Sequence, residues 1–329
     1  FNISGVEATY TDPQQRLFLE EAWKSLEDAG YVGDAIEGSR CGVYLGCTSG
    51  DYGALMQQGN VPPQAFWGNS GSITPARIAY FLDLQGPALS IDTACSSSLV
   101  AIHVGCQALR AREVELALAG GVFIQSSESF QTSAGGAGML SPHGRCYTFD
   151  DRADGFVASE GVGVVVLKRL SDALAAHDHI HGVIRGSGIN QDGTTNGITA
   201  PSALSQERLE CQVYDTFGID PAQISLVEAH GTGTKLGDPI EFQALTKAFR
   251  RYTSERQFCA IGSIKTNLGH AAAAAGVAGV LKVLLSLRHG QVPASLHFEN
   301  GNGHIDFAGS PFFVNTALRA WPAQPGRRR

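Results

Sequence analysis

Apolar residues along this chain follow two patterns, short uninterrupted runs and longer segments in which they recur every three or four positions. A short apolar run predicts a buried strand, whereas the three-to-four spacing predicts a helix with one buried face. Strands are expected at 41–47, 87–92, 116–124, 161–167, 224–229 and 258–264. Helices are expected between them, so strand and helix alternate as they do in α/β proteins.

Residues that start and stop helices sharpen these predictions. Asp12 and Pro13 provide an N-cap and a first-turn proline, and Gly30 ends the helix that follows. Further helices are expected within 69–82, from Cys95, over 205–217, from Asp238, and from His270 to about 287.

The two halves of the chain repeat one arrangement, a strand followed by a buried helix with a reactive residue at its start. That residue is Cys95 in the first half and His270 in the second. No Pro/Ser-rich linker interrupts the sequence, which predicts one unit over 1–329 with pseudo-halves of roughly 1–170 and 171–329. Continuous apolar strands between helices predict sheets that are covered on both faces.

Composition narrows the functional classes. Hydrophobic residues make up 43% of the chain and charged residues 17%, so a large core is expected. The net charge of -7 gives no basis for binding nucleic acid or an anionic membrane. Seven cysteines without a CxxC pair favour a reducing compartment, and we expect a cytoplasmic protein. The longest apolar stretch, 271–287, contains Lys282 and is interpreted as a buried helix rather than a membrane span.

Cys95 is the first candidate for chemistry. It follows a predicted strand within the small-residue segment DTACSSS (92–98), and a helix is expected to begin at it. Such a strand–turn–helix corner exposes a side chain as a nucleophile elbow does, and the positive end of a helix favours a thiolate. A small buried cysteine packed at a helix start would show the same local pattern.

Two histidines form the second group of candidates. His230 stands where a predicted strand meets GTGTKLG, a segment that lacks the order of a phosphate-binding loop. His270 opens a predicted helix, whose dipole would keep the imidazole neutral. A turn histidine and an N-cap histidine are the alternatives. A buried Lys265 would need a carboxylate, and Glu241 fits unless it only completes a capping box begun by Asp238.

Three motifs occur together in a fixed order: TACSSS, HGTGT and KTNLGH. With their α/β context they resemble the β-ketoacyl synthase family, and above all the ketosynthase domains of modular type I polyketide synthases. The resemblance runs through nearly the whole chain, in DPQQRLFLEEAWKSLEDAG, GPALSIDTACSSSL, FDDRADGFVASEG and NQDGTTNGITAP. GITAPS and GMLSP look most like the subgroup that uses a free-standing acyltransferase.

The resemblance implies a thiolase-like α/β fold, duplicated in α-β-α-β-α layers, and an acyltransferase of the 3-oxoacyl-carrier-protein synthase type. Cys95 would accept an acyl chain from an acyl carrier protein and condense it with a decarboxylated malonyl unit. His230 and His270 would stabilise the enolate by hydrogen bonding. Lys265 and Glu241 would form a supporting ion pair.

Substrate contacts and partners follow from the same resemblance. Thr232 and Thr234 align with threonines that bind phosphopantetheine, and the segment around Met139 is expected to line the acyl tunnel. Phosphopantetheine belongs to the carrier protein, so no bound cofactor and no metal are implied, and HDHIH (177–181) is interpreted as an exposed loop. We expect a homodimer with 69–82 and 116–124 at its face, neighbouring polyketide synthase domains, and an acyltransferase in cis or in trans.

Departures from the family pattern predict a domain that is truncated at both ends. The usual first strand is missing, and the chain stops before a Gly-Phe-Gly-Gly-Thr-Asn loop whose N–H would join that of Cys95 in an oxyanion hole. We therefore expect weak activity from these residues alone. The alternatives are a non-elongating ketosynthase, a fatty-acid-type synthase, an initiating synthase or thiolase, a cysteine hydrolase and a non-catalytic domain.

Overall fold

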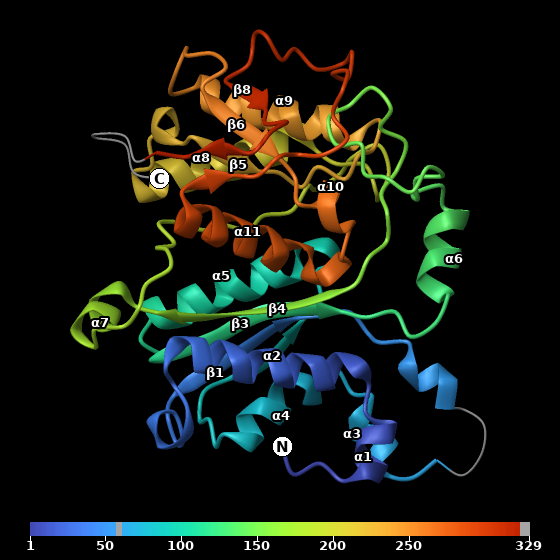
Figure 1. Ribbon diagram of the computed structural model, residues 1–329, viewed down its shortest axis with the longest axis vertical. Helices are drawn as coiled ribbons and strands as arrows, with labels where there is room; N and C mark the ends of the chain where they lie inside the picture. The colour runs from blue at the N-terminus through green and yellow to red at the C-terminus, as the bar shows by residue number, and fades with distance from the viewer. Residues whose placement is uncertain (57–60, 323–329) are drawn as a thin grey trace. The chain divides into compact units, whose positions relative to one another are not determined.

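The computed structural model describes residues 1–56 and 61–322, and the chain divides into two compact units (Figure 1). Unit 1 comprises Phe1–Ser133, Ser159–Ile180 and Ala271–Leu281. Unit 2 comprises Ala134–Ala158, His181–His270 and Lys282–Arg329. Each unit therefore contains segments from both halves of the chain.

A mixed four-stranded sheet forms the centre of unit 1. Its order is β2-β1-β3-β4, with β1 at Cys41–Gly46, β2 at Ala88–Ile91, β3 at Leu116–Phe123 and β4 at Gly161–Lys168. Strand β1 is parallel to β2 and β3, and β4 runs antiparallel to β3. All four strands lie within one residue of the predicted bounds, which confirms the apolar-run prediction. The antiparallel direction of β4 was not predicted.

Helices cover both faces of this sheet, as expected. Helix α2 (Pro13–Ala29) packs on β3 and β4, and α5 (Ser97–Arg110) packs on β1 and β3 from the other side (Figure 1). The Asp12 carboxylate accepts a hydrogen bond from the Gln14 N–H, and α2 ends at Gly30, so both predicted signals are confirmed. The remaining short elements are α1 (Gly5–Tyr10), η1 (Gly33–Ala35), η2 (Tyr52–Met56), α3 (Gln64–Gly68), α4 (Ile73–Phe81), η3 (Ala94–Ser96) and α7 (Leu170–Ala175).

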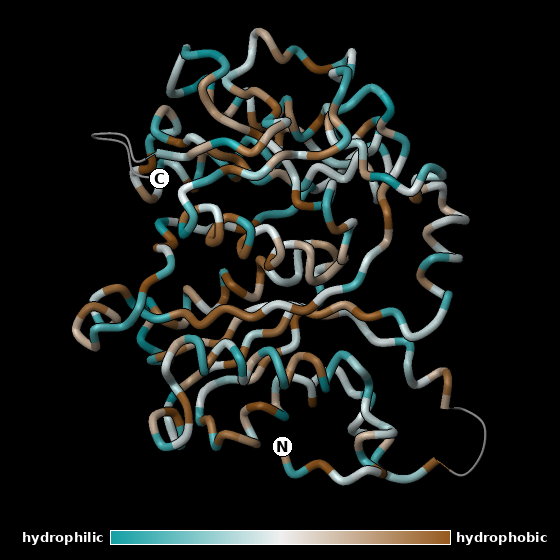
Figure 2. The backbone as a smooth tube through the Cα atoms, viewed as in Figure 1, coloured by the Kyte–Doolittle hydropathy of each residue, from teal (hydrophilic) through white to brown (hydrophobic). Residues whose placement is uncertain are grey.

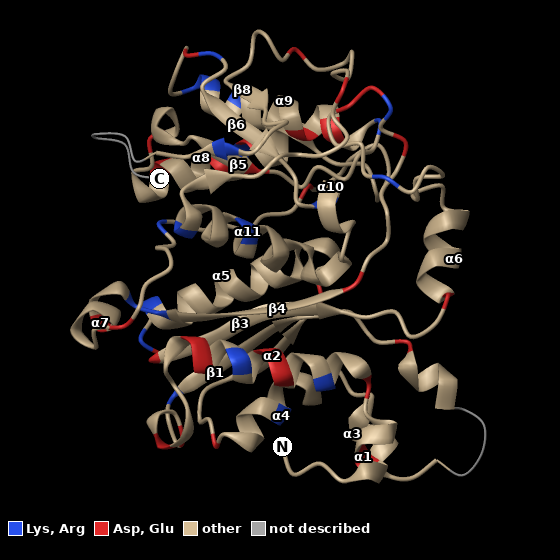
Figure 3. Ribbon diagram, in the orientation of Figure 1, with Lys and Arg blue, Asp and Glu red and all other residues tan. Residues whose placement is uncertain are grey.

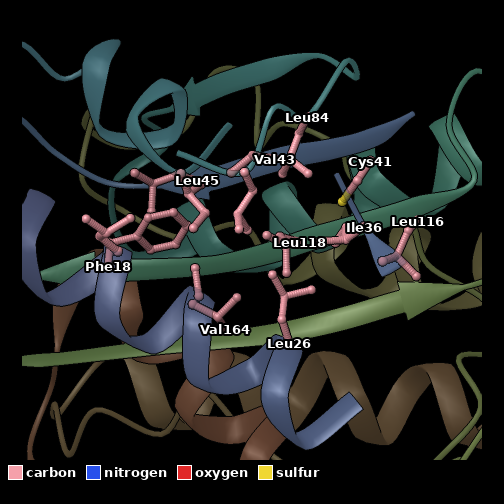
Figure 4. Close-up of a cluster of buried hydrophobic side chains, with 14 of the residues drawn as sticks. Phe18, Leu26, Ile36, Cys41, Val43, Leu45, Leu84, Leu116, Leu118 and Val164 are labelled. Atoms are coloured by element: carbon pink, nitrogen blue, oxygen red, sulfur yellow. The ribbon is translucent and has the colours of Figure 1, made fainter. Parts of the chain in front are cut away.

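The core of unit 1 lies between α2 and the sheet. Figure 4 shows Phe18 and Leu26 of α2 pointing toward Leu45 of β1 and Leu118 of β3, and all four side chains are fully buried. Burying one such side chain contributes about 1.5–3 kcal/mol. Figure 2 shows the matching hydrophobic run along β4, and Figure 3 shows charged residues on α2 but none along the middle of α5. Helix α5 is therefore the more apolar of the two helices that cover the sheet.

Unit 2 has its own parallel sheet, in the order β5-β6-β8. The strands are β5 (Leu226–Glu228), β6 (Cys259–Gly262) and β8 (Phe312–Val314), and a small antiparallel pair joins β7 (Gln291–Val292) to β9 (Arg319–Ala320). Helix α9 (Gly237–Arg250) packs Phe242 and Phe249 against Phe312, and α8 (Ala203–Phe217) packs on α9. Short elements are η4 (Pro221–Gln223) and α10 (Lys265–Leu268), and α6 (Ser129–Gly136) spans the unit boundary.

The helix in the long apolar segment of the second half begins later in the chain than predicted. His270 is followed by η5 (Ala272–Ala274) and then by α11 (Ala275–His289), so His270 is not at the start of that helix. By length and composition alone, Ala272–His289 is apolar enough to cross a membrane, with a mean hydropathy of 1.3. In the fold, Lys282 within this stretch is buried and forms an ion pair with Glu228.

Strand β3 contradicts one expectation about assembly. All its residues are buried, and it pairs with β1 on one edge and β4 on the other. A strand covered on both faces and paired on both edges has no surface for a partner chain, so its placement at a dimer face was wrong. The edge strands of this sheet are β2 and β4, and in β2 the residues Leu89 and Ser90 are exposed.

Candidate active site

Cys95 lies on a strained corner of unit 1. Strand β2 ends at Ile91, and three residues later Ala94 has a φ of 55°, in the left-handed region that costs a non-glycine residue about 1–2 kcal/mol. The Ala94 N–H donates to Oδ1 of Asp92 at 3.0 Å, which helps to hold this conformation. Cys95 follows as an exposed residue within η3. The predicted nucleophile-elbow geometry is present.

Serine hydroxyls hold the corner together. The Thr93 N–H donates to Oγ of Ser97 at 2.9 Å, and that hydroxyl donates to the Ala94 carbonyl at 2.7 Å. The Ser96 hydroxyl donates to the Thr93 carbonyl at 2.9 Å. Helix α5 begins at Ser97 rather than at Cys95, because these side-chain bonds close a 3₁₀ turn first. Cys95 therefore precedes the helix but remains at its positive end.

His230 and His270 are neighbours in unit 2. Their ring centroids lie 5.4 Å apart with the rings at 88°, an edge-to-face contact. His230 follows β5, whereas His270 pairs with Ala158 in a single β-bridge and donates its N–H to the Val157 carbonyl at 2.7 Å. The ring of Phe156 lies 5.0 Å from the His270 ring. The two histidines that the sequence proposed are thus brought together.

Burial, rather than a helix dipole, keeps these histidines neutral. His270 is 3% exposed, and burial, helped by the positive charge of Lys265 and by the neighbouring His230 ring, lowers its pKa to about 3. His230 keeps a water-accessible surface, but surrounding protein atoms and Lys265 also lower its pKa. The predicted neutral state of His270 is present, but its predicted cause was wrong. A neutral ring offers one N–H donor and one acceptor.

Acidic side chains organise the loop that carries His230. One carboxylate oxygen of Glu241 accepts the His230 N–H at 2.6 Å, and the other accepts the Gly231 N–H at 2.8 Å. Asp238 accepts the N–H groups of Gly233 and Thr234 at 3.1 and 3.2 Å. Neither carboxylate caps α9, so the capping-box alternative for this pair was wrong. Both acids instead hold the loop after β5.

Lys265 is buried and acts on two carboxylates. Burial raises the pKa of Glu241, and the positive charge of Lys265 is among the influences that oppose this. Burial likewise raises the pKa of Glu228, opposed first by Lys282, then by the Ile264 N–H and then by Lys265. Glu228 also accepts the Ile264 N–H. Sequence reasoning missed Glu228, although an acidic residue inside a predicted apolar strand, two positions before His230, was a usable signal.

The residues proposed for substrate contact also lie in unit 2. Thr232 and Thr234 place their hydroxyl oxygens 3.2 Å apart, and the Gly237 N–H donates to the Thr234 hydroxyl at 3.2 Å. Met139 is 46% exposed, and its carbonyl accepts the Phe156 N–H at 3.0 Å. Met139 is therefore bonded to the residue whose ring packs on His270.

The HDHIH segment is tied to unit 1 through its aspartate. Asp178 accepts hydrogen bonds from Lys168 and from the Tyr31 hydroxyl, each at 2.7 Å. His177 and His179 are exposed, as expected for a surface loop. Within residues 1–56 and 61–322, no group of three or more His, Cys, Asp or Glu side chains is placed to hold a metal ion.

The sequence of this chain also matches known protein families and curated proteins. Residues 1–173 match the family description "Beta-ketoacyl synthase, N-terminal domain", and residues 181–299 match "Beta-ketoacyl synthase, C-terminal domain". Polyketide synthase PksL of Bacillus subtilis is 53% identical over 329 residues, which is 100% of this chain and 7% of PksL. Polyketide synthase ThaG of Burkholderia thailandensis is 47% identical over 329 residues, which is 100% of this chain and 6% of ThaG.

Solved structures resemble the fold closely. A ketosynthase from module 6 of the bacillaene synthase of Bacillus subtilis has a TM-score of 0.95 at 53% identity, covering 99% of this chain and 56% of its own. Ketosynthase twelve of the Bacillus amyloliquefaciens bacillaene synthase has a TM-score of 0.92 at 37% identity, covering 98% and 58%. These values confirm the predicted thiolase-like α/β fold. The chain spans somewhat more than half of these solved chains and far less of the curated relatives.

Proposed function

This chain belongs to the β-ketoacyl synthase family, and from that premise we propose that it loads an acyl chain on Cys95 and extends it by decarboxylative condensation. Cys95 is the residue that carries this proposal. Six of the seven cysteines lie off the elbow, and five of those are buried. Cys95 is exposed, follows a left-handed residue and precedes a helix.

The first step is acyl transfer. The Cys95 sulfur attacks the carbonyl carbon of a carrier-bound thioester, and a new S–C bond forms as the bond to the pantetheine sulfur breaks. The pantetheine thiolate leaves and takes up a proton. Splitting the reaction in this way leaves the acyl group held at a fixed place for the second step.

The second step is condensation. A malonyl-type thioester loses its carboxylate as carbon dioxide, and the electron pair of that C–C bond becomes an enolate. His230 and His270 would donate hydrogen bonds to the enolate oxygen, which is a preorganised electrostatic role. The enolate carbon then attacks the Cys95 thioester, forming a C–C bond and releasing the cysteine thiolate. The edge-to-face pair of neutral imidazoles supports this assignment, because each ring has an N–H to donate.

Lys265 supports the neutral state of both rings. Its positive charge lies close enough to lower the pKa of His230 and of His270. Glu241, which holds the backbone of His230, is also under the influence of that charge. We therefore assign Lys265 and Glu241 to positioning rather than to proton transfer.

Acyl carrier proteins would be the partners that deliver both substrates. The hydroxyls of Thr232 and Thr234 suit an uncharged polar phosphopantetheine arm, and exposed Met139 suits the wall of an acyl channel. No bound cofactor or metal is part of the proposal. The acyltransferase, in cis or in trans, and neighbouring polyketide synthase domains would supply and consume the bound chain.

We also propose a homodimer, built on the open edge of β2 instead of on β3. Leu89 is 44% exposed on that strand, and Tyr80 at the end of α4 is 91% exposed. Among residues 1–56 and 61–322, β2 pairs with β1 alone, and an edge strand beside exposed apolar side chains suits pairing with a second copy of the chain. A cytoplasmic location is proposed as well, supported by the buried thiols of Cys41, Cys47 and Cys146.

Two alternatives within the family remain distinguishable. A non-elongating ketosynthase would pass chains on without needing an enolate-binding histidine, but His230 is present and packed on His270. A fatty-acid-type synthase would use the same residues on other carrier proteins. The observations therefore favour an elongating enzyme. Its specificity for carrier proteins would distinguish a polyketide-extending enzyme from a fatty-acid-type synthase.

An acylation assay tests the proposal. The protein is incubated with acyl-pantetheine thioesters, and the adduct is found by intact mass and peptide mapping. We expect one acyl group on Cys95, none on Cys95→Ala, and normal loading of the control Cys106→Ala, which lies farther along α5. An adduct on another residue, or no adduct, would contradict the assignment.

A further inference from the structure

Ser98, three residues after Cys95, is fully buried and bonds to a different helix. Its hydroxyl oxygen accepts the Val277 N–H at 3.0 Å. Val277 is the third residue of α11, and the first four N–H groups of a helix have no partner inside that helix. Ser98 of α5 therefore caps the start of α11.

The surroundings of Ser98 leave little freedom. A Cβ atom on Gly276 would lie 3.0 Å from the Ser98 oxygen and 2.5 Å from Cγ of Leu99. A Cβ atom on Gly121 of β3 would lie 2.6 Å from Cβ of Ser98 and 2.7 Å from the Ala273 carbonyl oxygen. The hydroxyl is thus enclosed where the first turns of α5 and α11 meet inside unit 1.

The contact also lies next to the turn that carries Cys95. Cys95 lies in η3, which is continuous with α5, and η3 packs against η5, which is continuous with α11. A buried N–H without an acceptor is destabilising, so removing the Ser98 hydroxyl would favour separation or rotation of the two helix starts. Either change would move the sulfur of Cys95.

We propose that Ser98 is a positioning residue for Cys95, because its hydroxyl ties the first turn of α5 to that of α11 and so fixes the corner that presents the sulfur. The inference rests on the proposed acyl-transfer function. Acyl transfer needs reacting atoms placed to within about 0.5 Å, whereas a small alkylating reagent reacts with any accessible thiolate. Comparing the two reactions therefore distinguishes the placement of the Cys95 sulfur from its exposure to solvent.

The test uses Ser98→Ala in the full chain, with acylation by acyl-pantetheine and alkylation by iodoacetamide measured from about pH 6 to 9, a range that brackets the ordinary thiol pKa. We expect kcat for acylation to fall about 10- to 100-fold with KM little changed, since misplacement by about 1 Å costs on that order. Alkylation should stay within about threefold of wild type with the same pH profile. Ser286→Ala, a buried serine farther along α11, is the matched control and should acylate normally.

Gly276→Ala provides a second test from the facing helix, because it keeps the Ser98 hydroxyl but crowds it. It should lower acylation as Ser98→Ala does, and it decides the matter if Ser98→Ala does not fold. Wild-type acylation by a folded Ser98→Ala or Gly276→Ala would overturn the inference. An equal loss of alkylation and acylation would assign Ser98 to folding alone. If wild type forms no adduct on Cys95, the proposed function fails first and this inference with it.

Discussion

Two corners of unit 1 have a similar backbone conformation but carry different side chains. Ala94 has a φ of 55° and Ala272 a φ of 39°, and each is the first residue of a 3₁₀ turn, η3 or η5. Each turn leads directly into a long helix, α5 or α11. The residue after the left-handed alanine is Cys95 in the first corner and Ala273 in the second.

The surroundings of the two corners are opposite. Cys95 is exposed and followed by three serines, two of which bond back into the turn. Ala273 is fully buried, and its neighbours in η5 are also alanines. A strained backbone alone therefore does not mark a reactive site. Exposure and local hydroxyl groups distinguish the corner of Cys95 from the buried corner of Ala273.

Moving the thiol from one corner to the other would have the largest effect. Cys95→Ala should abolish acyl loading, with a loss of at least about 10³-fold, because the thiol proposed to form the thioester is removed. Cys95→Ala combined with Ala273→Cys should not restore loading, since position 273 is fully buried. Intact mass after incubation with acyl-pantetheine measures both variants. Acylation at position 273 in the double variant would show that the backbone shape alone suffices.

The next prediction tests whether the corner of Cys95 and the loop of His230 act in different steps of the reaction. His230→Ala should still load an acyl group, but condensation should fall about 10²–10³-fold because one donor to the enolate is lost. Loading is followed by intact mass and condensation by product release from a malonyl-charged carrier protein. His304→Ala, at an exposed position, serves as the control. Equal losses in the two steps would contradict the division of labour between the two regions.

Unit 1 also shows what the sequence could and could not predict. Its strands were predictable because uninterrupted apolar runs such as that of β3 have no other stable place than a covered sheet. The helix ends at Asp12 and Gly30 were predictable from local hydrogen bonding and backbone preference. Ser96 and Ser97 were visible only as small residues, since their bonds depend on a turn that the pattern does not specify.

Site residues were predicted better than their causes. His230 and His270 were proposed from motifs and do meet, but the neutrality of His270 was assigned to a helix dipole. Helix α11 begins at Ala275, farther along the chain, and burial with Lys265 supplies the effect. Asp238 and Glu241 fitted a capping box by spacing, yet their carboxylates bond a loop that only the tertiary fold brings near. Spacing identifies local partners, whereas long-range contacts need the fold.

A smaller effect, on stability, is expected from a substitution at Gly121, which lies close to Ser98 and to Ala273. Gly121→Ala would place a methyl group 2.6 Å from Cβ of Ser98 and 2.7 Å from the Ala273 carbonyl oxygen. Because the backbone at Ala273 cannot move freely, the free energy of unfolding should fall by about 1–3 kcal/mol. Denaturant unfolding measures this change. The control is Gly71→Ala, whose added methyl group would meet open space. An unchanged stability in Gly121→Ala would mean that the corners are not closely packed.

The last effect concerns acid, and it separates the corners because a buried histidine precedes only the second one. The pKa of His270 is about 3 in the folded protein, against about 6.5 for an unperturbed histidine in the unfolded chain. Between those values the unfolded state binds a proton that the folded state does not. The free energy of unfolding should therefore fall as pH decreases from about 6.5, by up to about 1.4 kcal/mol per pH unit from this group.

A variant isolates this contribution from groups that act in the opposite direction. Burial raises the pKa of Asp238 to about 7, so that carboxyl binds its proton more readily when folded and partly offsets the loss in acid. His270→Gln removes only the histidine contribution, so its stability should depend less steeply on pH than that of wild type between about pH 6 and 4. Denaturant unfolding at each pH gives the slopes. Parallel slopes for the two proteins would mean that His270 takes up a proton in the folded state, which would contradict its proposed role as a neutral donor to the enolate.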